Sequence, residues 1–250
     1  MSIISNIYGL TEIYQEILLE YLNSDLTHYI DNFNKNLNHD CEIMQLLGTP
    51  TWYNDPDAIL EYLEAQVKYN SSVSSEYQIT SVVLDIEPWS ISSDWEDDFL
   101  STIKTVQTYS QENNLKIYYV VPYWLSTLDG YSTLYQEIID NSNGVMVMNY
   151  NRNIYQTMLT PYLDYSQSQN KEIYSIAELQ PVSSSLTSDL TYNQVGLRVL
   201  NNNWYNLFIQ YNYEKLSFAF DDYTYLKILN TSLQKQNILF LYILNAILRY

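Results

Sequence analysis

The sequence predicts an α/β fold, a (β/α)8-type TIM barrel that is incomplete or permuted at its termini. Strand-like and helical stretches alternate along the 250 residues, and repeating units of about 30 to 40 residues are typical of parallel βαβ crossovers. No Pro/Gly/Ser-rich linker divides the chain, so we expect a single domain over residues 1–250. An open Rossmann-like sheet is the alternative, and it is disfavoured because the chain lacks both glycine-rich nucleotide-binding motifs.

The strands are predicted from short apolar runs rich in β-branched residues. They are Ile3–Tyr8, Glu42–Leu47, Ser81–Ile86, Lys116–Val121, Gly144–Asn149, Glu172–Ala177 and Leu216–Phe220. Helices are predicted between them, at Thr11–Asn38, Asp55–Tyr69, Asp94–Asn113, Leu128–Asn141, Ile154–Gln169 and Leu190–Leu207.

This set of strands is one short of a closed barrel. Either an upstream strand is missing, or residues 238–244, after a helix at Tyr223–Gln234, form a permuted strand in the vacant place. A plain terminal helix is the other interpretation of that C-terminal run.

The most informative segment is Ser81–Trp89, S-V-V-L-D-I-E-P-W. Its apolar residues predict a buried strand, and the two-residue period of a strand places Asp85 and Glu87 on one side as the strand ends. Pro88 cannot donate to a ladder and ends the strand. Chemistry in α/β folds lies at the carboxyl ends of strands, so we expect a site here. A solvated loop with ordinary acids is the alternative.

The charge balance excludes several classes of partner. Only 11 Lys and Arg stand against 29 Asp and Glu, which gives a net charge of −18. Without a basic stripe we expect no nucleic-acid binding and no attraction to anionic membranes. The single cysteine, Cys41, excludes an intrachain disulfide. No apolar run is long enough to span a membrane and no signal peptide is visible, so we expect a cytoplasmic protein, or a secreted one if a leader lies upstream.

The other predicted strand ends are rich in acids, amides and aromatics. In chain order these candidate residues are Trp52, Trp89, Tyr123, Trp124, Asn149, Tyr150, Arg152, Glu178, Asp221, Asp222 and Tyr223. Carbohydrate chemistry needs this mixture, since two carboxyls cleave a glycosidic bond while aromatics pack on sugar rings. We expect no cofactor and no resident metal, with an all-carboxylate Mg²⁺ or Ca²⁺ site at Asp85, Glu87 and Asp221 as the competing interpretation.

The strand-end motifs resemble a known group of proteins. L-L-G-T-P-T-W, V-L-D-I-E-P-W, V-V-P-Y-W, V-M-V-M-N-Y-N-R, I-A-E and F-A-F-D-D-Y, between about Cys41 and Tyr225, are similar to little-characterised bacterial TIM-barrel proteins with glycosidase-like cores. The wider glycosidase clan keeps its acid/base in a Glu-Pro pair and its nucleophile at a later strand end. The resemblance therefore implies Glu87 as acid/base, tuned by Asp85, and Glu178 as nucleophile or base.

One departure and one further resemblance keep alternatives open. Ile86 stands where that clan usually has Asn. The D-x-E spacing also resembles chitinase-like barrels, which implies a substrate-assisted reaction through Asp85, Glu87 and Tyr150. The leading hypothesis is a glycoside hydrolase acting on an oligo- or polysaccharide. The rival from another class is a degenerate barrel that binds carbohydrate or protein without catalysis, with homo-oligomers across an unclosed sheet edge.

Overall fold

The computed structural model describes residues 11–37, 41–127, 133–221, 224–226 and 228–229. The predicted strand Ile3–Tyr8, the predicted strand at 238–244, and the candidate residues Asp222 and Tyr223 lie outside this part of the chain. So does most of the predicted helix Tyr223–Gln234.

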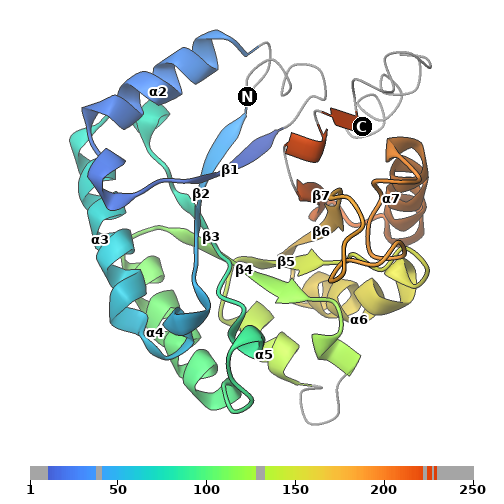
Figure 1. The fold of residues 1–250 in the computed structure, drawn as a ribbon. Helices are drawn as coiled ribbons and strands as arrows, with labels where there is room; N and C mark the ends of the chain where they lie inside the picture. Colours follow the sequence, from blue (N-terminus) through green and yellow to red (C-terminus); the bar gives the residue numbers. More distant parts are fainter. Residues whose placement is uncertain (1–10, 38–40, 128–132, 222–223, 227, 230–250) are drawn as a thin grey trace. The chain divides into compact units, whose positions relative to one another are not determined.

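The fold is α/β and TIM-barrel-like, with seven strands among the described residues, which are joined in chain order in one sheet (Figure 1). The strands are β1 (Glu12–Glu16), β2 (Glu42–Leu47), β3 (Ser81–Leu84), β4 (Lys116–Pro122), β5 (Gly144–Met148), β6 (Glu172–Glu178) and β7 (Leu216–Asp221). The ladders β1–β2, β2–β3, β3–β4 and β6–β7 are parallel. The predicted fold class is thus confirmed.

Helices connect these strands. They are α2 (Ser24–Lys35), α3 (Pro56–Ser72), α4 (Glu96–Glu112), α5 (Leu134–Asp140), α6 (Tyr155–Ser168) and α7 (Leu197–Tyr211). Short 3-10 turns follow several strands, namely η1 (Leu19–Tyr21), η2 (Pro50–Asn54), η4 (Pro88–Ser90) and η5 (Leu125–Thr127), and η3 (Ser75–Tyr77) precedes β3. The Asp55 carboxylate accepts the Ala58 N–H and caps α3, as the Asp-Pro pair predicts.

The first helix prediction is wrong over nearly its first half. A helix was expected over Thr11–Asn38, but Glu12–Glu16 form β1 and the helix begins at Ser24. Ile13 and Ile17 are four residues apart, which imitates the buried face of a helix. In the structure both are buried beside β2, because pairing with a neighbouring strand overrides the local pattern.

The contacts of the chain divide it into two compact units. One comprises Met1–Val121 and Gln136–Val145, and the other Pro122–Tyr135 and Met146–Tyr250. The predicted single domain stays a prediction.

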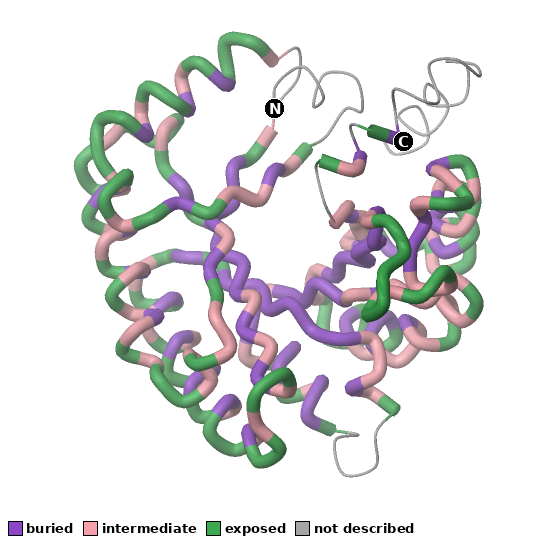
Figure 2. The backbone as a smooth tube through the Cα atoms, viewed as in Figure 1, coloured by how far each residue is buried: buried purple, intermediate pink, exposed green. Residues whose placement is uncertain are grey.

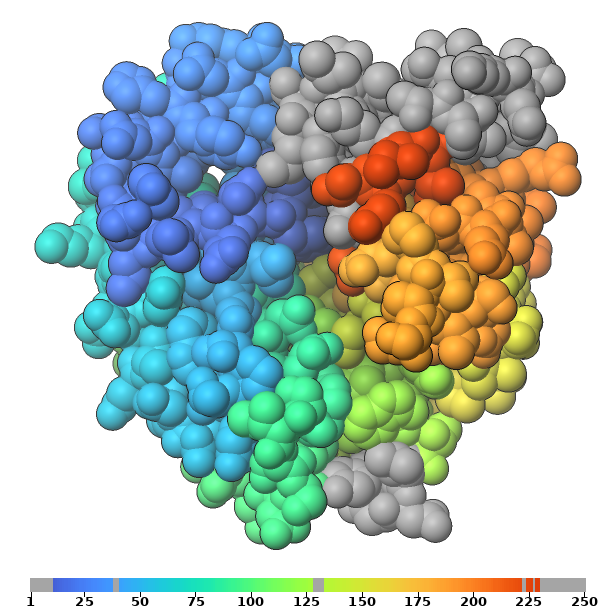
Figure 3. All heavy atoms as spheres, viewed as in Figure 1, coloured from blue at the N-terminus to red at the C-terminus, as the bar shows by residue number. Residues whose placement is uncertain are grey.

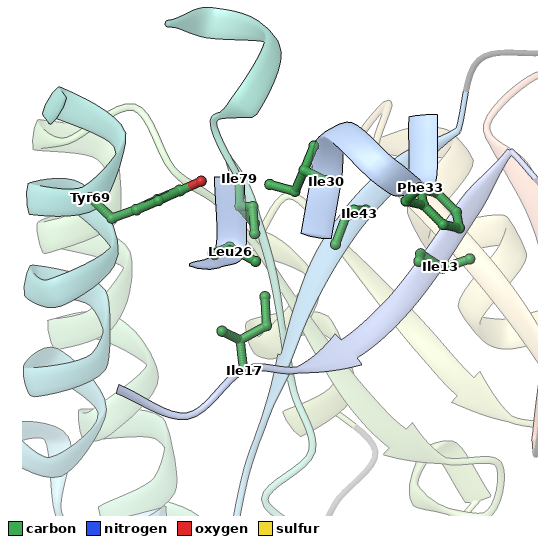
Figure 4. Packing of buried hydrophobic residues seen from close by; sticks show 8 residues of the cluster. All are labelled: Ile13, Ile17, Leu26, Ile30, Phe33, Ile43, Tyr69 and Ile79. Atoms are coloured by element: carbon green, nitrogen blue, oxygen red, sulfur yellow. The ribbon is translucent and has the colours of Figure 1, made fainter. Parts of the chain in front are cut away.

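In the first unit, α2, α3 and α4 lie along the same side of β1 to β3 (Figure 1). Strands β3 and β4 are almost wholly buried (Figure 2). A hydrophobic cluster joins β1, α2, β2 and α3, and Figure 4 shows its members: Ile13, Ile17, Leu26, Ile30, Phe33, Ile43, Tyr69 and Ile79. This packing holds β1 and β2 against α2 and α3, and β2 pairs in turn with β3, the strand that leads to Asp85 and Glu87.

Candidate functional site

Asp85 and Glu87 follow β3, as predicted. The strand was expected to run to Ile86 and to place both acids on one side, but it ends at Leu84 and Glu87 is not in an extended conformation. The strand ends at Leu84, and the Asp85 N–H then donates to the Leu47 carbonyl at 2.8 Å, which adds one more bond to the β2 side. Both acids are half-buried, while Ile86 between them is buried. Asp85 is therefore held as an extension of the sheet, and Glu87 begins the turn that leaves it.

Glu87 has an unusual backbone conformation. Its φ of 50° and ψ of 52° lie in the left-handed region, directly before Pro88. The other non-glycine residues with positive φ in the described chain are Asn114, Asn170 and Asn212, all of them at or just after the ends of helices. Asparagine is the residue, after glycine, that this region tolerates best. Glutamate is not, so a strained backbone is kept at this one carboxylate.

Two of the predicted aromatics flank this turn. Turn η2 with Trp52 contacts turn η4 with Trp89, and Figure 3 shows the light-blue chain near residue 50 beside the green chain near residue 90. The Trp52 ring packs on Tyr62 of α3, with ring centroids 5.3 Å apart, and Trp89 packs edge-on against Trp95 at 5.7 Å. Both tryptophans are half-buried, so each has an inner face held by another ring and some surface left for a ligand.

Trp95 was missed as a supporting residue. It is 3% exposed and links Trp89 to Phe99 of α4. The sequence signal for it was the position of an aromatic directly before a run of acids that starts a helix.

In the second unit, the carboxyl ends of β5, β6 and β7 bring Tyr150, Glu178 and Asp221 together. Glu178 and Asp221 are register partners in the β6–β7 ladder. The Tyr150 hydroxyl donates to Asp221 Oδ2 at 2.9 Å. The sequence prediction that these strand ends collect acids and a tyrosine is therefore met within this unit.

Glu178 is buried, with 5% of its surface exposed, and its Oε1 accepts the Gln180 N–H at 2.7 Å. Its main-chain carbonyl accepts the Tyr192 N–H and the Thr191 hydroxyl. The side chain and the backbone of Glu178 thus hold both ends of the connection from β6 to α7, whose middle is exposed (Figure 2). These bonds give Glu178 a loop-holding role, which was not predicted.

Arg152 holds the same connection. Its guanidinium Nη2 donates to the Ser188 carbonyl at 2.5 Å, and its main-chain N–H donates to Asp189. The guanidinium also lies over the Tyr192 ring, 5.9 Å from its centroid, and burial raises the pKa of the Tyr192 hydroxyl. These contacts describe a residue that anchors a loop, and the substrate-binding role predicted for Arg152 stays a prediction.

Asn149 is also engaged inside the fold. It is 4% exposed, and its Nδ2 donates to the Tyr155 carbonyl at the start of α6 and to Ser175 Oγ of β6. Tyr123 and Trp124, predicted as substrate-binding aromatics, are half-buried just after β4, where the Trp124 carbonyl accepts the Thr127 N–H in a turn. Their role toward a ligand stays a prediction.

Neither a metal centre nor a membrane span is found in the part of the chain that the structure describes. No group of three or more His, Cys, Asp or Glu side chains there is placed to hold a metal ion. Among the same residues, no helix has the length and apolar character needed to cross a bilayer.

Comparison with known proteins finds similarity at the level of the fold. No family model matches the chain, and no curated protein does. Among solved structures, the spore cortex-lytic enzyme SleL of Bacillus cereus is similar at 10% identity with a TM-score of 0.53, over 86% of this chain and 65% of that one. A GH18 chitinase from Pseudoalteromonas aurantia is similar at 14% identity with a TM-score of 0.50, over 91% of this chain and 94% of that one.

The chain spans 65% of the length of the SleL enzyme it resembles, so that protein contains structure with no counterpart here. At these identities the likeness concerns the fold. The likeness supports a TIM-barrel-like α/β fold.

Proposed function

We propose that this chain is a glycoside hydrolase that cleaves a polysaccharide of N-acetylated amino sugars, with Glu87 as the acid. The observation that carries the proposal is the left-handed conformation of Glu87 at the carboxyl end of β3. Strain of this kind is characteristic of functional positions, because a residue with no task there would be replaced by glycine or asparagine.

The proposed step is protonation of the glycosidic oxygen by the Glu87 carboxyl as the bond to the anomeric carbon breaks. Asp85, two residues earlier, is assigned the role of tuning the Glu87 carboxyl. Trp52 and Trp89 would pack against the faces of sugar rings on either side of the bond that is cleaved. The likeness in fold to a chitinase and a cortex-lytic enzyme supports this class of substrate.

Two versions of the proposal differ in the group that attacks the anomeric carbon. Glu178 as nucleophile would require a carboxylate that reaches the substrate, yet one of its oxygens is engaged with the Gln180 N–H and the residue is nearly buried. We therefore favour the substrate-assisted version, in which the acetamido oxygen of the sugar itself attacks the anomeric carbon. Water then opens the resulting ring, with Glu87 acting as the base.

The test uses the full chain with N-acetylglucosamine oligomers and with purified peptidoglycan, and new reducing ends are followed by chromatography and mass spectrometry. Glu87→Gln should lower turnover by about 10² to 10⁴-fold while the tryptophan fluorescence response to the oligomers is kept. The matched control is Glu112→Gln, which changes an exposed carboxylate at the end of α4 and should leave turnover unchanged.

De-N-acetylated oligomers separate the two versions. If the acetamido group is the nucleophile, the wild-type chain cleaves only the acetylated oligomers, whereas a Glu178 nucleophile would cleave both. Wild-type binding without any turnover would overturn the proposal in favour of a carbohydrate-binding barrel that is not an enzyme.

A further inference from the structure

Gly48, directly after β2, lies against the backbone of the segment that carries the two acids. A Cβ atom built on Gly48 would stand 1.9 Å from the Asp85 carbonyl oxygen, 2.4 Å from its carbonyl carbon and 2.9 Å from its amide nitrogen. All three atoms belong to backbone, which cannot swing aside as the end of a long side chain can. Any side chain at position 48 would therefore push the Asp85 peptide away.

The backbone at this point is already fixed from the same side. The last ladder pair of β2 and β3 is Leu47 with Leu84, and the Asp85 N–H bonds to the Leu47 carbonyl one step later. The backbone of Gly48 thus lies so close to that of Asp85 that no room remains for a Cβ atom between them. Only glycine allows both this hydrogen bond and this contact.

We propose that Gly48 is a positioning residue for Glu87: its missing side chain sets the Asp85 peptide, and through it the strained turn that aims the Glu87 carboxyl. Glu87 follows Asp85 by two residues, and its left-handed backbone leaves little freedom to absorb a shift upstream. This inference rests on the proposed function of Glu87. It explains why one of only five glycines in the chain follows β2.

The variant Gly48→Ala tests the inference, and Gly196→Ala is its matched control. Gly196 has φ of +80° but no atom within 4 Å of a built Cβ, so alanine there adds backbone strain without a collision. The two variants therefore share the loss of glycine freedom, and they differ in the contact with Asp85. Circular dichroism and thermal unfolding report whether each variant folds.

The first readout needs no enzymatic activity. The chain is labelled with ¹³C at glutamate carboxyls, Glu87→Gln identifies the Glu87 resonance, and its chemical shift is followed through a pH titration. We expect Gly48→Ala to move the Glu87 resonance and its titration midpoint, and Gly196→Ala to leave both in place. A Glu87 titration that is identical in all three proteins overturns the inference, whether or not the chain is an enzyme.

The second readout is the separation of kcat from KM on a cleaved oligomer. A displacement of about 1 Å at a catalytic group costs on the order of 10²-fold in rate, so Gly48→Ala should lower kcat by about that factor and change KM far less. A moved Glu87 resonance without turnover in the wild type would retain the positioning role of Gly48 and reject the proposed function instead.

If Gly48→Ala does not fold, hydrogen exchange of the wild-type chain decides. The Asp85 amide, bonded to Leu47, should exchange as slowly as the amides inside β3. Exchange as fast as that of exposed loops would show a mobile peptide that Gly48 does not position, and would overturn the inference.

Discussion

The carboxyl ends of β3 and β6 each present a glutamate, and the two are held in opposite ways. Glu87 is half-buried on a backbone in the left-handed region. Glu178 is the last residue of a regular strand, is nearly buried, and is engaged by the loop that follows it. The sequence pattern predicts both as acids at strand ends and does not distinguish them. Their backbone conformations do.

The difference indicates what each carboxylate contributes. At β6 the carboxylate accepts the N–H of the half-buried Gln180, so we expect its effect to be on stability. At β3 the conformation costs stability, and a cost of this kind persists at sites where function requires it. We therefore expect changes at Glu87 to act on turnover and changes at Glu178 to act first on folding.

The largest expected effect is on turnover. Glu87→Gln should reduce kcat by about 10² to 10⁴-fold, as expected for loss of a general acid. Glu178→Gln keeps the shape of the side chain and an oxygen that can accept the Gln180 N–H, so it should reduce kcat by less than about tenfold. Rates on N-acetylglucosamine oligomers measure both. Equal losses in the two variants would break the contrast and restore Glu178 as the nucleophile.

The second effect is on folding. Glu178→Ala leaves the Gln180 N–H without its acceptor beside a buried site, and we expect the free energy of unfolding to fall by about 1–3 kcal/mol. Urea denaturation at neutral pH measures it, with Glu214→Ala, an exposed acid before β7, as the control. A loss no greater than that of the control would mean that the loop is held without Glu178.

The third effect concerns the backbone strain at Glu87 and is measured as a difference in stability. Glu87→Gly and Glu87→Ala both remove the carboxylate, but only glycine adopts the left-handed region freely, so the glycine variant should be more stable than the alanine variant by about 1–2 kcal/mol. The same pair of substitutions at Asn114, a left-handed position after α4, calibrates the comparison. If the alanine variant at 87 were equally stable, the backbone there would not be strained, and the observation behind the proposed function would be lost.

The sequence predicted the class of the fold because its signals were local. The apolar run before Asp85 and the Asp-Pro start of α3 each specify one element. The residues of β1 were predicted as a helix, because the spacing of Ile13 and Ile17 fits both the helical and the strand period until the pairing with β2 is known. The type of an element, helix or strand, was thus predictable where the local hydrophobic pattern alone specifies it. The prediction failed where pairing with a neighbouring strand decides the type.

The sequence predicted which strand ends carry the candidate residues, but it did not predict what each residue does. Arg152 was predicted to bind substrate, which stays a prediction, and in the structure it also bonds to the Ser188 carbonyl. No spacing in the sequence signals such a contact. The same holds for Gly48, whose importance comes from a backbone that approaches it from another strand. Residues whose function depends on a long-range contact need the structure to be recognised.

The smallest expected effect concerns the Tyr150–Asp221 hydrogen bond. Tyr150→Phe removes the hydroxyl that donates to Asp221 Oδ2 and should lower the free energy of unfolding by about 0.5–1.5 kcal/mol, the usual net value of such a bond. Tyr205→Phe, at an exposed tyrosine of α7, is the control and should have almost no effect. A double-mutant cycle with Asp221→Asn measures the coupling energy of the pair. A coupling energy close to zero would mean that the Tyr150–Asp221 hydrogen bond does not stabilise these strand ends, and would leave Glu178 as the residue there that acts on folding.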